Sequence, residues 1–491
     1  MISHWATRHV RKLLLAYGVL FAVVGTLVLG GTPRSSLELQ GARADSITGS
    51  ISVLDRGGPP LLGSEGGQPV APEAGDDPGA ILYLSLLGHA VGSSDPLQLL
   101  KWMFVGAFAL LFAVYPILWF ELLSSAAAAL ISPLLLLFGF RFLAVHDIYW
   151  VAAWCILLCI PLIALVHRRW SGNSLIYLSG VMLIASLASS IRASAGLPVV
   201  LAAAISTVWN VRGWLRRVAW LAVLAVAYLA ISGPSMTAVR HYRDESVGID
   251  YSKEFSKGHT FWHPAYLGLG YLPNKFGIKL VDSAGLRAAQ RVNPKVEYLS
   301  PQYERILRHL YLRILKKDPG YVIRVYVDKA SVVLADAFRR FWLGILLLPA
   351  MLVAPTRLRG EARLFAVLLV PAVLLGAASP ILWVPGTTYE AGWLGAWGLL
   401  WLLAILWLVA LISRAAVTSG VVDSFSGSGR LPRFRRYPRP PGTPAPRRAR
   451  SWSLLARQRP IRWSLAAMIL VCGIGLGLIR IADSVRAESA A

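Results

Sequence analysis

Long apolar runs separated by short polar segments dominate this chain and predict a membrane protein. A helix needs roughly 20 mostly apolar residues to cross a bilayer. Eleven runs approach or reach that length, which predicts an all-α polytopic membrane protein with about 11 transmembrane helices. The candidate spans are residues 13–31, 102–120, 126–143, 148–166, 175–191, 197–209, 218–236, 341–354, 364–384, 393–412 and 464–481.

One block of polar and aromatic residues, 237–338, interrupts the apolar runs. We predict that these roughly 100 residues form a mostly helical or irregular insertion outside the bilayer. Within it, residues 301–317 repeat apolar side chains at helical spacing, which predicts an amphipathic helix. Asp318 and Pro319 then supply the N-cap and first residue of another helix, which is expected to continue into the eighth span.

The composition agrees with a membrane protein and changes how its charge is interpreted. Hydrophobic residues make up 56% of the 491 residues, charged residues only 15%, and the mean hydropathy is +0.57. A net charge of +24 would favour nucleic-acid binding in a soluble protein, but here the basic residues gather between apolar runs. Basic residues in such places orient helices, so we expect no nucleic-acid partner.

Basic residues before the first span, among them Arg8 and Arg11, place the amino terminus in the cytoplasm of a multi-pass protein of the cell membrane. Alternation of the spans then places the insertion on the extracytoplasmic side, which is also the expected active side. The turn near Glu121 falls on the cytoplasmic side although it has no basic residue of its own. The basic segments expected on the cytoplasmic side are 167–169, 212–217, 357–363 and the Arg-rich stretch after Arg414.

The chain divides into five parts on this scheme. They are 1–236, with about seven spans and an extracytoplasmic first loop (32–97); the insertion, 237–338; 339–413, with spans eight to ten; a basic, Pro-rich cytoplasmic linker, 414–462; and 463–491, with the last span and tail. We expect the linker to contact anionic lipid. In the first loop we expect a mobile first half and a surface helix over residues 76–88.

Acidic residues on the outer side are the candidates for catalysis. Asp76 and Asp77 stand directly before an apolar helix, where a carboxylate could remove a proton from an acceptor hydroxyl. Asp147 lies on a short turn, which is expected to hold it close to the same plane at the membrane boundary as Asp76 and Asp77. These residues do not indicate a particular cofactor, although a divalent cation could bind to acids of this kind. Further outer acids are Asp244, Glu245 and Glu390.

The aromatic stretch 259–274 supplies candidates for sugar binding. It contains side chains that stack on sugar rings or hydrogen-bond to their hydroxyls, namely Trp262, His263, Tyr266, Tyr271 and Asn274. The alternative is an aromatic cap that packs on the membrane surface. His259 and His263 have the spacing of a helical metal pair, but Pro264 favours an irregular loop, so no metal site is predicted.

Arginines on the same side are candidates to bind a phosphate, because a guanidinium group matches two phosphate oxygens with two hydrogen bonds. The candidates are Arg192, Arg240, Arg243 and Arg287. A structural ion pair is the alternative for each of them.

This layout resembles the GT-C membrane glycosyltransferases, the superfamily that includes protein O-mannosyltransferases and lipid A aminoarabinose transferases. The resemblance lies in Gly75-Asp76-Asp77-Pro78 and the apolar helix after it, more loosely in Asp147, and in the block from Tyr266 to Asn274. It implies inverting transfer of a sugar from a polyprenyl-phosphate donor to an extracytoplasmic acceptor of the cell envelope, which could be a glycan, a lipid or a protein. It also implies that Asp76 or Asp77 is the general base and that an arginine meets the leaving phosphate.

Two other classes fit part of the pattern. An O-antigen-type ligase or polymerase also combines many spans with one large outer loop, and His263 with Arg243 would then form its centre. A non-enzymatic lipid or solute carrier is the third class. Carriers usually hold ionisable residues or broken helices at mid-membrane, whereas the spans here are nearly free of charge.

Overall fold

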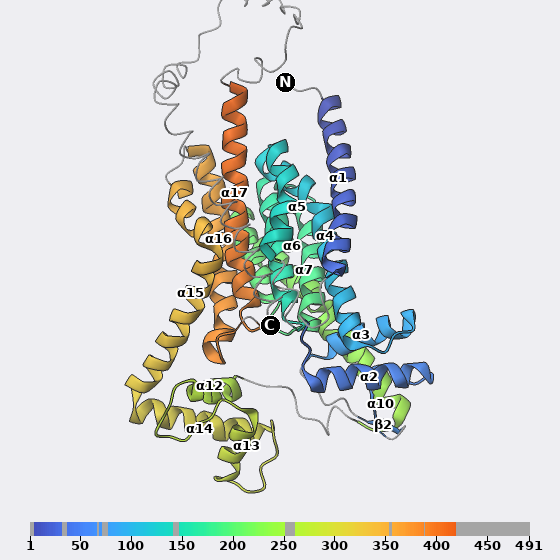
Figure 1. The fold of residues 1–491 in the computed structure, drawn as a ribbon, viewed down its shortest axis with the longest axis vertical. Coiled ribbons are helices and arrows are strands. Elements are labelled where there is room, and N and C mark those ends of the chain that lie inside the picture. The colour runs from blue at the N-terminus through green and yellow to red at the C-terminus, as the bar shows by residue number, and fades with distance from the viewer. Residues whose placement is uncertain are drawn as a thin grey trace, which may run out of the picture.

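The computed structural model describes residues 4–31, 37–65, 68–70, 77–140, 147–250, 261–352, 356–386 and 388–418. Figure 1 shows a bundle of long helices with shorter helices gathered at one end. The bundle helices are α1 (His4–Gly30), α4 (Pro96–Leu123), α5 (Ala126–Phe140), α6 (Trp150–Arg168), α7 (Ser174–Ile191), α8 (Leu197–Asn210), α9 (Trp214–Ala230), α15 (Pro319–Leu352), α16 (Thr356–Leu382) and α17 (Ala391–Thr418).

Seven helices in the described part of the chain are long and apolar enough to cross a membrane, which confirms the helical membrane class. Of the other expected spans, 126–143 and 197–209 correspond to the shorter apolar helices α5 and α8. The expected span 341–354 falls in the second half of α15, and 464–481 lies outside the described residues. The total of eleven therefore stays a prediction.

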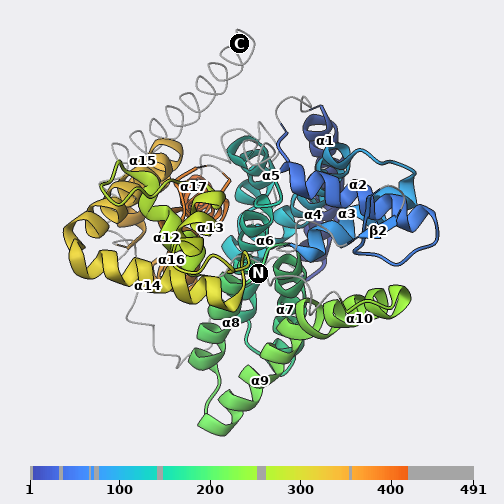
Figure 2. The same cartoon turned by 90° about the horizontal axis from the view of Figure 1, so that it is seen from below.

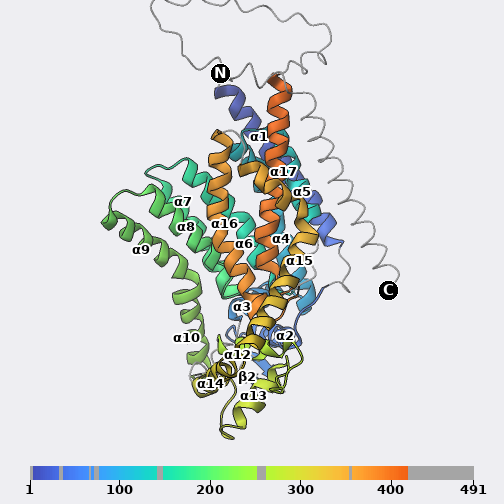
Figure 3. The same cartoon turned by 90° about the vertical axis from the view of Figure 1, so that its left-hand side faces the viewer.

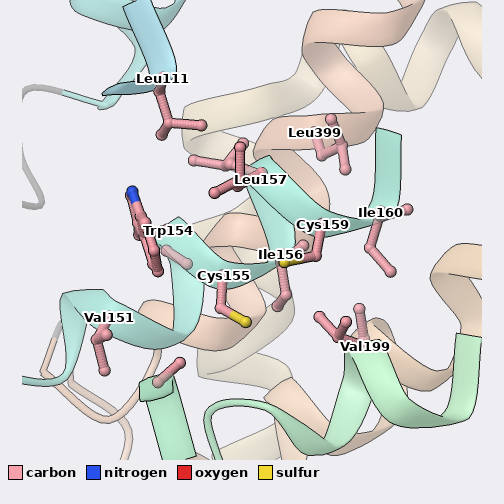
Figure 4. Close-up of a cluster of buried hydrophobic side chains, with 14 of the residues drawn as sticks. Leu111, Val151, Trp154, Cys155, Ile156, Leu157, Cys159, Ile160, Val199 and Leu399 are labelled. Atoms are coloured by element: carbon pink, nitrogen blue, oxygen red, sulfur yellow. The ribbon is translucent and has the colours of Figure 1, made fainter. Parts of the chain in front are cut away.

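The bundle is packed around α6, whose membrane-spanning window is 72% buried. Figure 4 shows side chains of α6 meeting Leu111 of α4, Val199 of α8 and Leu399 of α17. Cys155 and Cys159 are both fully buried here, so they face neighbouring helices. A helix that is apolar on all sides is stable only when surrounded by other apolar surface, and α6 therefore forms the centre of the bundle.

Basic residues at or near three other helices contact the end of α4, where Glu121 lies. The Glu121 carboxylate pairs with Arg11 of α1 at 2.6 Å and with Arg169 just after α6. Arg168 and Arg414 donate to main-chain carbonyls at the same end of α4. Segments that the sequence places on one side of the membrane thus meet at one end of the bundle, which we call the Glu121 end.

The first loop lies at the opposite end, the Asp77 end, and contains more structure than expected. It forms α2 (Gly41–Asp55), an antiparallel hairpin of β1 (Gly63–Glu65) with β2 (Gln68–Val70), and α3 (Pro78–Val91). The surface helix expected over 76–88 is confirmed as α3, and Figure 1 shows α2 and α3 lying across the bundle axis. The expectation of a mobile first half is wrong for α2, because Ile47 and Ile51 bury one face of that helix.

The insertion lies at the Asp77 end and has a hydrophobic cluster of its own, with Leu267, Tyr303 and Leu307 among its buried residues. Its helices are α10 (Met236–Val247), α12 (Trp262–Gly268), followed by a 3-10 turn (Leu269–Tyr271), α13 (Asp282–Gln290), α14 (Pro301–Lys317) and the first half of α15. Both helices expected from the sequence are confirmed. Asp318 caps α15 by accepting a hydrogen bond from the Tyr321 amide at 3.0 Å, and the helix kinks at Phe341.

α9 and α10 form a continuous helical rod, because a single π-helical turn (Ile231–Ser235) joins them. Figure 3 shows α9 at the outer side of the bundle, beside α7 and α8, with α10 continuing the rod toward the Asp77 end. Many of the apolar side chains of α9 are exposed, with Val226 at 70% and Leu229 at 53%. Such a surface is suited to lipid rather than to water.

Candidate active site

The carboxylate of Asp77 is buried at the centre of an ion network at the Asp77 end. Asp77 is the N-cap residue of α3 and is only 1% exposed. Its Oδ2 accepts hydrogen bonds from Nε of Arg43 at 3.0 Å and from Nη2 at 2.6 Å. Nη1 of Arg192, directly after α7, donates to both carboxylate oxygens at 3.0 and 3.2 Å. Asp77 therefore joins α2, α3 and the end of α7.

Arg43 links this carboxylate to a second acid. Its Nη1 donates to Oδ2 of Asp147 at 2.6 Å. Asp147 is also held by its main chain, because its amide donates to the carbonyl of Glu38 at 3.1 Å and its Oδ1 accepts from the amide of Ile148 at 2.6 Å. The structure thus brings together three residues that the sequence predicted separately, Asp77, Asp147 and Arg192, through an arginine that was not predicted.

The network is electrically balanced, with two carboxylates and two guanidinium groups. Burial opposes charge on Arg43, but Asp77 and Asp147 outweigh it and raise the pKa of Arg43 above its ordinary value. Burial also raises the pKa of Asp147, and the adjacent Arg43 opposes that rise. Removal of one member from such a group leaves a buried charge uncompensated, so the four side chains depend on one another.

Tyr149 contacts both arginines of the ion network and also lines a pocket. The guanidinium carbon of Arg192 lies 4.4 Å from the ring centroid of Tyr149, and that of Arg43 lies 5.6 Å away. The ring of Tyr389, in the α16–α17 loop, meets Tyr149 edge-on with centroids 5.1 Å apart. The face of an aromatic ring attracts a cation, so Tyr149 helps to fix both arginines.

The pocket is a partly open site with about 430 Å³ of space between atoms, a figure that includes open solvent. Its lining includes apolar side chains of α6, α8 and α16, namely Ala152, Ile156, Pro198 and Leu375. It also includes polar side chains, namely Tyr149, Arg192, Ser194, Ser379, Thr388 and Tyr389. A lining that combines apolar side chains with a cation and several hydroxyls suits an amphipathic ligand with an anionic group.

α3 reaches this site through a close contact between main chains. A Cβ atom on Gly79 would lie 2.3 Å from the carbonyl oxygen of Ser190, at the end of α7. Only glycine lets α3 approach α7 so closely, and this approach brings Asp77 within reach of Arg192.

The remaining predicted residues near the site are placed differently. Asp76 lies outside the described residues. Arg240 and Arg243 are on α10, where Arg243 pairs with Asp244 at 2.7 Å. Figures 1 and 2 show α10 and α12 on opposite sides of the molecule, so the structure does not bring Arg243 and His263 together as a ligase centre.

The aromatic residues predicted to bind a sugar lie in the insertion. His263 is 2% exposed, with Nδ1 2.6 Å from the Tyr303 hydroxyl and Nε2 3.2 Å from Oδ1 of Asp282. Tyr266 is buried, and Arg308 lies over the ring of Trp262. Tyr271 lies in the 3-10 turn after α12.

The Asn274 amide makes hydrogen bonds only within its own loop in the contacts described, donating to the carbonyls of Leu272 and Ile278 and accepting from two amides. Sugar binding by the aromatic residues stays a prediction. Within the described ranges, no group of three or more potential ligands is placed to hold a metal ion.

Sequence reasoning missed Arg43 and the two tyrosines. Arg43 lies in a helix of small and polar residues whose apolar face is narrow, and nothing in its neighbours indicates a buried cation. Tyr149 stands two residues after Asp147, and Tyr389 directly before Glu390, so their positions beside predicted outer acids were an available signal.

No protein-family model matches the chain, and no curated protein sequence matches it. Among solved structures, the chain is similar to the oligosaccharyltransferase of Archaeoglobus fulgidus in its apo form, with 12% sequence identity and a TM-score of 0.43. The match covers 88% of this chain and 54% of that one, so the chain spans about half the length of the archaeal protein. A similarity this weak assigns no function.

Proposed function

We propose that this chain is a membrane glycosyltransferase of the GT-C type, which transfers a sugar from a polyprenyl-phosphate donor to an extracytoplasmic acceptor of the cell envelope. The main support is Arg192, which lines a partly apolar pocket and is held by a buried carboxylate at the start of α3. A prenyl phosphate needs this combination, because its chain is apolar and its head group is anionic.

Arg192 has the geometry to receive a phosphate. Both of its hydrogen bonds to Asp77 leave from Nη1, and the same residue is part of the pocket wall. A guanidinium group has five N–H donors, so an arginine held at one nitrogen keeps others for a ligand. The hydroxyls of Ser194 and Thr388 also line the pocket and are donors for phosphate or sugar oxygens.

In the proposed reaction, an acceptor hydroxyl loses its proton to a carboxylate while its oxygen bonds to the anomeric carbon of the sugar. The bond from that carbon to the phosphate oxygen breaks, and the electron pair leaves with the phosphate. Configuration at the anomeric carbon is inverted. Arg192 offsets the charge that grows on the leaving phosphate, which is the kind of preorganised electrostatic contribution that dominates many enzymes.

Asp77 and Asp76 have different parts in this proposal. Asp77 is buried and its two oxygens accept four hydrogen bonds from two arginines, so it serves to aim Arg192 rather than to take a proton. Asp76 is therefore the proposed general base. Asp147 holds Arg43 and thereby supports Asp77 from the other side.

The experiment compares binding of a polyprenyl phosphate with binding of the polyprenol of the same length, in detergent. The wild-type protein should prefer the phosphate. Arg192→Met should weaken phosphate binding about 10- to 100-fold, the loss expected for a charge-assisted hydrogen bond, and should leave polyprenol binding unchanged. Arg216→Met is the matched control, since Arg216 is exposed on α9. Equal binding of both ligands to the wild-type protein would refute the proposal.

A transfer assay tests the base. With a panel of polyprenyl-phosphate sugars, Asp76→Asn should retain donor binding but lose about 100- to 10,000-fold in transfer rate. Retention of full activity would exclude Asp76 as the base.

A further inference from the structure

Three positions on one face of α15 contact the two ends of the α16–α17 loop. Lys329, Val333 and Asp336 are spaced at i, i+4 and i+7, which places them on the same side of a helix. Lys329 is fully buried, and its Nζ donates to the carbonyls of Leu382 at 3.3 Å and Trp383 at 2.6 Å. Burial lowers the pKa of Lys329 to about 7, and in its protonated form the side chain also offsets the partial negative charge at the end of α16.

The other end of the loop is held by an acid pair. Glu390, directly before α17, is 2% exposed and lies close enough to Asp336 for the two acids to interact. Burial, then Asp336, raise the pKa of Glu390 to about 7, which favours a protonated Glu390 that can donate to the Asp336 carboxylate. Arg340 donates to Asp336 at 2.8 Å, and the Trp393 indole donates to the Val333 carbonyl at 3.1 Å.

The residues of the same loop directly before Glu390 form part of the pocket wall. Thr388 and Tyr389 line the pocket, and Tyr389 packs on Tyr149 beside Arg192. In a short loop that is held at both ends, the residues between the two contacts have little freedom to move. The contacts of α15 therefore determine where Tyr389 stands in relation to Arg192.

The insertion packs on the first of these contacts. The main chain at Gly268 of α12 approaches so closely that a Cβ there would lie 2.0 Å from the Leu382 carbonyl oxygen and 2.8 Å from Nζ of Lys329. The Trp383 indole lies nearly parallel to the His263 ring, with centroids 6.0 Å apart. Thus α12, Lys329 and the start of the α16–α17 loop form one packed unit.

We propose that Lys329 and Glu390 are positioning residues that hold the α16–α17 loop against Tyr149, so that the insertion fixes the shape of the pocket. The effect on a ligand rests on the proposed function of that pocket, whereas the effect on the loop does not. In this arrangement the insertion acts on Arg192 through the loop, without a contact of its own to the phosphate.

The experiment measures the loop position directly. Cys155, Cys159 and Cys472 are replaced by Ala, cysteines are placed at Tyr149 and Tyr389, and a short bis-maleimide joins them. Lys329→Met and Glu390→Ala should each slow cross-linking about 10-fold, the effect of losing a buried charge-assisted hydrogen bond. Glu390→Gln keeps a donor to Asp336 and should restore the rate. Arg324→Met, exposed on the same helix, is the control and should change nothing.

A second measurement separates this inference from the proposed function. In chains that keep both tyrosines, Lys329→Met should weaken polyprenyl-phosphate binding about 10-fold. Unchanged cross-linking in both variants overturns the inference, whatever the ligand does. If cross-linking slows but the wild-type protein does not prefer the phosphate, the positioning role stands and the proposed function fails. If Lys329→Met does not fold, Glu390→Ala and its Gln counterpart test the other end of the loop.

Discussion

Arg192 and Asp77 are 115 residues apart in the chain and are joined by two hydrogen bonds from a single guanidinium nitrogen. This pair ties the end of α7 to the start of α3. Because Asp77 also accepts from Arg43, the charge of each member is balanced only while the others are present. The consequences can be measured on the folded protein before any substrate is known.

Replacement of Arg43 should destabilise the protein strongly. Arg43→Met leaves Asp77 with Arg192 alone and Asp147 without its arginine, both in a buried site. The expected loss is about 3–5 kcal/mol, the usual cost of breaking a buried pair. Thermal unfolding in detergent measures it. Arg56→Met is the control, because Arg56 is exposed at the end of the same helix. Equal losses in both variants would show that the ion network contributes nothing.

A methyl group at Gly79 should separate α3 from α7. The new Cβ would collide with the Ser190 carbonyl, and relief of that contact has to move Asp77 away from Arg192. Overpacking of this kind costs about 1–3 kcal/mol. Gly106→Ala offers a matched control, since nothing lies within 4 Å of its added Cβ. Circular dichroism melts should show a lower midpoint for Gly79→Ala only.

Glu390 should make stability depend on pH between about 4.5 and 7. Its pKa is raised from 4.5 to about 7 in the folded protein, so the folded state binds the extra proton in this window and stability falls as pH rises. Glu390→Gln stays neutral and avoids this loss. Its advantage over the wild-type protein should be small near pH 4.5 and reach ~3 kcal/mol at most above pH 7. A constant difference across this range would contradict the assignment.

The two ends of the bundle should face opposite sides of the membrane. Arg212 and Lys295 are both exposed, one in the turn between α8 and α9 and the other in the insertion. In cells expressing single-cysteine variants that lack the native cysteines, an impermeant maleimide should label Lys295→Cys from outside and reach Arg212→Cys only after permeabilisation. Labelling of both from the same side would overturn the orientation.

The elements that follow from short-range rules could be predicted. α14 and α15 were placed by their apolar spacing and by the Asp318-Pro319 pair, because capping and side-chain periodicity act within one or two turns. The surface helix α3 was found because its apolar run begins directly after an acidic N-cap.

The site itself depends on contacts that no local pattern records. Arg43 meets Asp147 across 104 residues, and its own helix has a weak apolar pattern. Aromatic density is ambiguous for a different reason, since the same residue types build a ligand site and a small hydrophobic core. In the insertion Tyr266 and Tyr303 contribute to such a core, and sequence cannot separate the two uses.

The ion pairs of Glu121 have a consequence for biosynthesis. Among the described residues, the Glu121 carboxylate at the end of α4 pairs with Arg11, made earlier, and with Arg169, made later. The charge of this acid is therefore balanced by tertiary assembly rather than by the α4–α5 hairpin alone. Until the chain has been synthesised through Arg169, Glu121 lacks the second of these partners.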